Sequence, residues 1–183
     1  ASKAISYSIP ANYSRGIPHS YSWGYVANRT DLAKREIGLE TRHALLKKAV
    51  ALGKQGLEYI QRTGSTHAIF HISAELSTAL YNLATLETGI ERGQLLEEAL
   101  KLGENAVYFT EPLRPHFMWP QSLSYKALAL TLFELGKLEE RTEKRKELLE
   151  KSVSGMEKCI TSLQRHVTSF PSRIELFALL GSS

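Results

Sequence analysis

Apolar side chains recur at three- and four-residue spacing along most of the chain, and no stretch alternates apolar and polar residues for long enough to indicate a strand. In residues 42–60 the apolar and small positions, among them Leu46, Ala49, Gly53 and Ile60, form one broad stripe opposite several lysines. Similar patterns predict helices over about 66–88, 92–109, 120–135 and 140–165. The expected fold class is all-α.

One helical sequence pattern occurs three times, and we call it the second-helix pattern because another predicted helix precedes each copy. The first copy begins with Arg42-x-x-Leu45-Leu46, and the pattern recurs beginning at Arg92 and at Arg145, at offsets of 50 and 53 residues. In each copy two small residues hold the places where a neighbouring helix must come close. These small positions are Ala49, Ala99 and Ser152, and then Gly56, Ala106 and Cys159. The chain is therefore expected to consist of three units, each a helix, a glycine turn and a helix.

Glycines mark the expected ends of the first helices, at Gly38, Gly89 and Gly136. The first helix of unit one either starts near residue 20 or starts after a cap at Asn28 or Thr30. Residues 1–18 show no clear period and are expected to form an extended arm.

Prolines mark the link after the second unit, whereas no proline stands between the first and second units. The residue before a proline disfavours the α region, so Glu111-Pro112 and Arg114-Pro115 are expected to break the chain after the 92–109 helix. After Pro171, Ser172 and Glu175 have the spacing of a capping box. A short C-terminal capping helix is expected over 172–180, with Ile174, Leu176, Phe177, Leu179 and Leu180 as its apolar residues.

The helical hairpins resemble the tetratricopeptide (TPR) repeat. The best local match is Tyr125-x-x-Leu128-Ala129-x-x-Leu132-x-x-x-Gly136, and Asn82-Leu83-Ala84 is similar. The resemblance covers about residues 20–165 and implies a right-handed stack of antiparallel hairpins at about 19–63, 65–112 and 115–168, whose first helices line a concave surface that binds a peptide or another protein. The unit here is about 50 residues, whereas the family's is 34.

Composition narrows the function classes only slightly. The formal net charge of +4 and the pI near 9.1 favour an acidic partner weakly and do not demand nucleic acid. With Cys159 as the one cysteine, the chain can form neither an internal disulfide nor a cysteine metal cage, which fits a reducing, cytoplasmic location. No apolar run approaches the ~20 residues of a membrane span, and the start lacks the apolar core of a signal peptide, so no membrane association is expected.

No catalytic or metal-binding pattern stands out. His67 and His71 are four residues apart and could share a metal, but no third ligand has a complementary spacing, so positions at the helix start or in a groove are favoured for them. Cys159 occupies a small position of the repeat and is expected to be a buried packing residue. Neither a phosphate loop nor a nucleophile elbow occurs. We expect no enzyme activity, no cofactor and no metal.

Two sets of residues are candidates for partner binding. The first helices are expected to present a polar and aromatic set near the concave side, which suits an acidic or C-terminal peptide: Asn28, Arg29, Tyr81, Asn82, Tyr125 and Lys126. Arg114, Phe117 and Trp119 form a second set that is either an exposed hot spot or tucked into a junction between hairpins. Packing of the tyrosines and solvation of the others is the competing interpretation of the first set.

The leading hypothesis is a non-catalytic scaffold that binds a protein or peptide, as a module of a regulatory or signalling protein. A nucleic-acid-binding helical repeat is one alternative, although acids and bases alternate through residues 139–151 and do not form a basic stripe. Self-association into a homo-oligomer through an uncapped end of the repeat is the other.

Overall fold

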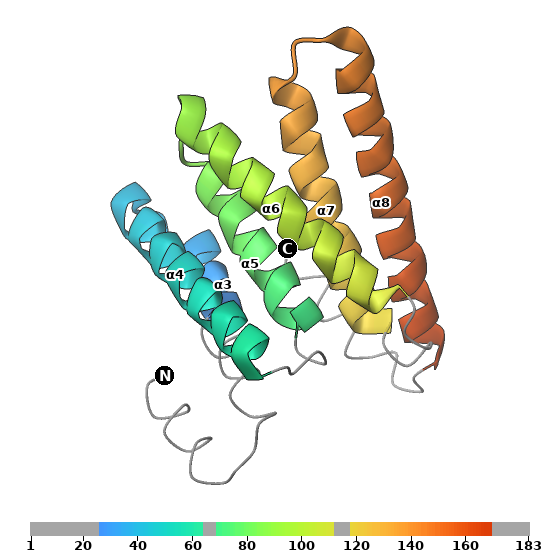
Figure 1. The fold of residues 1–183 in the computed structure, drawn as a ribbon, viewed down its shortest axis with the longest axis horizontal. Helices are drawn as coiled ribbons and strands as arrows, with labels where there is room; N and C mark the ends of the chain where they lie inside the picture. Colours follow the sequence, from blue (N-terminus) through green and yellow to red (C-terminus); the bar gives the residue numbers. More distant parts are fainter. Residues whose placement is uncertain (1–25, 64–68, 112–117, 170–183) are drawn as a thin grey trace, which may run out of the picture.

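The computed structural model describes residues 26–63, 69–111 and 118–169, and these residues form helices joined by short links, with no strand among them (Figure 1). The all-α prediction is confirmed for this part of the chain. The helices are α3 (Asn28–Arg35), α4 (Leu39–Thr63), α5 (Ile69–Ala84), α6 (Gly89–Thr110), α7 (Met118–Leu138) and α8 (Thr142–Ser169).

Each helix packs against the next one in the chain, and α5 also contacts both α3 and α7. Figure 1 shows the resulting order, from α3 and α4 at one side to α7 and α8 at the other, with α6 crossing in front of α5 and α7. The three copies of the second-helix pattern therefore lie on α4, α6 and α8, and α3, α5 and α7 precede them.

The core follows the apolar stripes. Its fully buried side chains come mainly from α4, α5 and α6, and include Leu46, Ile60, Ile72, Leu80 and Leu96. All six small positions of the repeat pattern are buried, as their expected role in close helix packing requires.

Two glycines allow the first helix of the next hairpin to come close to α4 and to α6. A Cβ on Gly53 of α4 would lie 2.7 Å from the Leu76 side chain of α5, and a Cβ on Gly103 of α6 would lie 3.1 Å from the backbone Cα of Leu128 in α7. Gly53 and Gly103 occupy the same place in the sequence pattern. These two glycines therefore let the next helix along the chain pack against α4 and α6 in the same way.

Serine hydroxyls join the two helices of a hairpin. Ser77 of α5 donates to the Ala99 carbonyl of α6 at 2.7 Å, and Ser152 of α8 donates to the Ala129 carbonyl of α7 at 2.7 Å. Ala99 and Ser152 are matching positions of the pattern. The hydroxyl donor is therefore on the first helix in the α5–α6 hairpin and on the second helix in the α7–α8 hairpin. A buried hydroxyl needs such a partner because water cannot replace it.

A buried carboxylate fixes the start of α6 against the end of α7. Glu134 is 6% exposed and accepts hydrogen bonds from Arg92 at 2.5 Å and from Lys137 at 2.9 Å. Removing Arg92 would leave Lys137 as the remaining cation partner of the buried carboxylate, in a site that water reaches poorly.

The glycines do not end the first helices as expected. Gly136 lies inside α7, where its missing side chain makes room for Leu149 of α8. Gly89 follows the end of α5 by several residues and begins α6 with a φ of +59°, a left-handed conformation that suits glycine. Gly38 likewise lies in the link after α3.

Helix α3 begins at Asn28, close to the later of the two expected starts, but the expected cap at Asn28 or Thr30 is wrong. Val26 and Ala27 already form a helical turn before α3, and Ala27 has α-helical dihedral angles. The Thr30 hydroxyl donates to the carbonyl of Val26 within the helix and caps nothing. A start near residue 20, the arm at 1–18 and the capping helix at 172–180 lie outside the described residues.

The glycine contacts give a stability test. Gly103→Val should lower the free energy of unfolding by about 1–3 kcal/mol, because the new methyl groups meet Leu128 backbone that cannot move aside. Gly93→Val is the matched control on the same helix, since nothing lies within 4 Å of a Cβ there. It should change stability by no more than about 0.5 kcal/mol in urea unfolding followed by circular dichroism. Equal stability of the two variants would contradict the close approach.

Candidate functional site

The first-helix candidates do not form one exposed group. Asn82 is 9% exposed, and its amide donates to the Thr78 carbonyl of its own helix. Tyr125 is buried and its hydroxyl donates to Glu111 at 3.1 Å. Asn28 and Lys126 are exposed, whereas Arg29 and Tyr81 are partly buried.

Lys126 lies near the carboxyl group of Glu75, whose pKa is raised well above its ordinary value. Burial raises the pKa of Glu75 in α5 to about 7, the charge of Asp31 raises it further, and Lys34 and Lys126 lower it. Charged side chains of α3, α5 and α7 therefore come close enough to influence one another around Glu75. The first helices thus bring their charges together around a titratable group that changes near neutral pH.

Tyr125 faces a different surface. The Lys158 ammonium of α8 lies 5.4 Å from the centre of its ring, and burial followed by the hydrogen bond to Glu111 raises the pKa of Tyr125 to about 12. The ring is one wall of a hollow of about 360 Å³ that runs between α6 and α8. Tyr125 is thus a candidate that the structure places in a groove between the second helices.

This α6–α8 groove continues toward the start of α8. A second hollow of about 620 Å³ shares Leu100 of α6 and Leu148 of α8 with the first. Helix α7 forms the floor beneath both. The apolar lining consists of Leu100, Val107, Leu128, Leu132, Leu135, Leu138 and Leu148.

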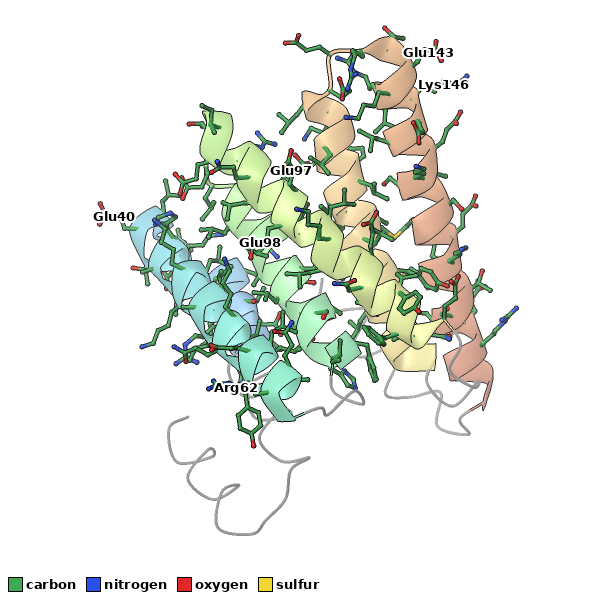
Figure 2. The ribbon with its side chains drawn as sticks, viewed as in Figure 1. Glu40, Arg62, Glu97, Glu98, Glu143 and Lys146 are labelled. Atoms are coloured by element: carbon green, nitrogen blue, oxygen red, sulfur yellow. The ribbon has the colours of Figure 1, made fainter. Side chains whose placement is uncertain are left out.

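The two edges of the groove carry opposite charges. Glu97 and Glu104 line it from α6, while Lys144, Lys151 and Lys158 line it from α8. These lysines pair with carboxylates of Glu139, Glu147 and Glu111, and Glu139, Glu140 and Arg141 also line the groove where α8 begins. Figure 2 shows Glu97 on the side of α6 nearer α7, and Glu98 on the side toward α4, where it pairs with Lys54 at 2.8 Å. The groove is therefore an apolar channel between an acidic α6 edge and an α8 edge whose lysines are paired with neighbouring carboxylates.

The corresponding place between α4 and α6 is bridged. His43 of α4 lies 2.5 Å from the Glu87 carboxylate in the link before α6, and Lys54 pairs with Glu98. In the sequence pattern His43 matches Gly93, which has no side chain to cross the groove. Lys54 matches Glu104 and Glu98 matches Lys151, so the acid and the base have exchanged helices. The pKa of Lys151 is raised mainly by its hydrogen bond to Glu147, and the charge of Glu104 adds a smaller contribution.

Other candidates show no chemistry in the described part of the chain. Cys159 is 3% exposed, and burial raises the pKa of its thiol, which disfavours the reactive thiolate. Within residues 26–63, 69–111 and 118–169 no group of three or more His, Cys, Asp or Glu side chains could hold a metal ion. Likewise, none of the described helices is both long and apolar enough to cross a membrane.

Several predicted residues cannot be placed. Arg114, Phe117 and His67 lie outside the described residues, and Trp119 belongs to α7 without a described side chain. The leucines and lysines of the groove were not predicted from the sequence. For the leucines of α7 a signal was available. Residues 128–138 contain five leucines, more than one buried face of a helix requires.

The pKa of Glu75 gives a test by pH. Its carboxyl binds a proton more tightly in the folded state than in the unfolded state, where the pKa is near 4.5, so its contribution to stability falls as the pH rises from about 4.5 to 7. Glu75→Gln should therefore be more stable than the original protein at pH 8, by about 2–3 kcal/mol. Near pH 4 the two proteins should be alike within about 1 kcal/mol. Urea unfolding at both pH values measures the difference, and a constant difference would show that Glu75 is not responsible.

Comparison with known proteins adds no relative. No protein-family model matches the chain, and neither a curated protein nor a solved structure was found to match it. The inference of function therefore rests on the helices, the groove and the charges described above.

Proposed function

We propose that this chain is a non-catalytic scaffold, built as a TPR-like right-handed stack of helical hairpins, that binds a helical segment of another protein in the α6–α8 groove. The observation that carries the proposal is the apolar channel whose two edges have opposite charge. An amphipathic helix laid in an apolar groove is a recurring mode of peptide recognition.

Recurrent contacts support the stack. Gly53 against Leu76 and Gly103 against Leu128 join successive hairpins in the same manner. Ser77 with Ala99 and Ser152 with Ala129 join the helices within hairpins at matching positions. A hairpin with one apolar stripe cannot bury it alone, and repetition of the same junction is how solenoid proteins solve that problem.

The size of the groove suits a helix. Its lining runs along α6 from Gly93 to Val107, a length of about 21 Å at 1.5 Å per residue. A bound helix of about fourteen residues would cover that length. Its apolar residues would need the spacing i, i+4, i+7 and i+11 to place one stripe on the leucine floor.

The edges define the charges of the partner. Bases on the helix flank beside α6 would face Glu97 and Glu104, and acids on the other flank would face Lys144 and Lys151. Turning the helix end for end exchanges its flanks, so the charge pattern selects the direction in which the partner lies. A nucleic acid, with phosphates on every side, would meet the acidic edge and be repelled by it.

A designed peptide tests this function. The probe is a fluorescent fourteen-residue helix with leucine at i, i+4, i+7 and i+11, lysine on one flank and glutamate on the other. It should bind the full chain more tightly than versions with lysine on both flanks or glutamate on both flanks, by about fivefold for exposed ion pairs. Fluorescence anisotropy at two salt concentrations measures the affinity and its charge dependence.

Charge reversal on the protein locates the site. Glu97→Lys with Glu104→Lys should weaken binding of the two-sided probe about fivefold and favour the peptide with glutamate on both flanks. The matched control is Glu40→Lys with Glu58→Lys on α4, which changes the net charge equally at exposed positions outside the groove lining. Equal effects of the two double variants, or no binding of any probe, would contradict the proposal.

A further inference from the structure

Helix α8 carries an apolar stripe that the described helices cover only in part, since its first residue, Leu149, packs on α7 at Gly136. The α8 stripe consists of Leu149, Val153, Met156, Ile160 and Leu163, at the spacing i, i+4, i+7, i+11 and i+14. Val153 is 60% exposed and Ile160 is 49% exposed. An open hollow of about 500 Å³ along this face is lined by α8 residues alone in the described part of the chain, Leu149 and Val153 among them.

The same five positions are more buried in the other two copies, although the second and fourth of α6 line the α6–α8 groove. In α4 they are Leu46, Val50, Gly53, Leu57 and Ile60, and in α6 they are Leu96, Leu100, Gly103, Val107 and Thr110. The first, third and fifth of each set are buried. Helix α5 packs against α4 at Gly53, and α7 packs against α6 at Gly103. In both cases the covering element is the first helix after a short link.

We infer that residues 172–180 form the first helix of a fourth hairpin and pack on the α8 stripe at Met156, Ile160 and Leu163. The inference rests on the equivalence of α4, α6 and α8 and is independent of what the α6–α8 groove binds. The chain leaves α8 at Ser169, and Pro171 with the Ser172–Glu175 capping box begins a new apolar segment directly afterwards.

The register of the contact supports this occupant. The leucine opposite the glycine lies 23 residues further on in one case (53 to 76) and 25 in the other (103 to 128). The same separations from Met156 reach positions 179 to 181, where Leu179 and Leu180 stand. One turn earlier in that segment, Leu176 would face Ile160, because the two helices run antiparallel.

Met156 differs from the glycines it replaces, and the difference is compatible with the inference. Its flexible thioether side chain can adapt its shape, so it can fill space between two helices that are further apart. The helix over 172–180 would therefore lie further from α8 than α5 lies from α4.

Disulfide trapping tests the contact in the full chain. In a Cys159→Ala background, Met156→Cys with Leu179→Cys should close an intramolecular disulfide, because this bond needs Cα atoms within about 7 Å of each other. Lys158→Cys with Leu179→Cys is the matched control, since Lys158 lines the α6–α8 groove. The first pair should oxidise at least about tenfold faster, as expected for thiols held together over thiols that meet by chance.

A second pair protects the test against a variant that fails to fold. Ile160→Cys with Leu176→Cys changes an exposed position of the stripe and should also cross-link within one chain. Circular dichroism of each variant checks its helix content. Faster closure of the Lys158 pair would place the segment in the groove, disulfides only between chains would make a second copy the occupant, and closure of no pair would leave the stripe open; each of these results overturns the inference.

Discussion

The close approach of neighbouring helices at Gly53 and Gly103 is the constraint on which the rest of the structure depends. A side chain at either place would overlap Leu76 or Leu128 and push the following hairpin away. With the hairpins in contact, the leucines of α5 and α6 are buried together and the core becomes continuous from α3 to α6. The arrangement of the surface, including the groove, is a consequence of this spacing.

Charge and shape at the two junctions between hairpins differ although the backbones correspond. Between α4 and α6 two polar contacts cross the gap, His43 with Glu87 and Lys54 with Glu98. Between α6 and α8, Gly93 stands in place of the histidine, and Lys151 pairs with Glu147 of its own helix at 2.6 Å. A small change of residue type therefore leaves one junction open while its neighbour is bridged.

The helices could be predicted from the sequence because each buries a stripe at helical spacing, and the second helices were the most regular. Their ends were harder to predict. Gly136 has the sequence context of a helix stop, yet it lies inside α7 because Leu149 of α8 needs its space. Long-range packing of this kind leaves no local signal. The groove was missed for the same reason, since Leu100 and Leu148 are 48 residues apart and each has the pattern of an ordinary core position. Tyr125 was identified as a candidate, but on a different surface.

The exchange of the serine donor between hairpins bears on how the chain avoids pairing its helices wrongly. If α5 packed against α8, the Ser77 and Ser152 hydroxyls would meet at one contact and compete for acceptors. If α7 took the place of α5 as the hairpin partner of α6, the Ala129 and Ala99 carbonyls would face each other there with no hydroxyl to donate. Helices α5 and α7 thus each match their own second helix at this contact. In a chain of similar segments, this difference in hydrogen-bond donors favours correct pairing during folding over exchange of helices between hairpins or between molecules.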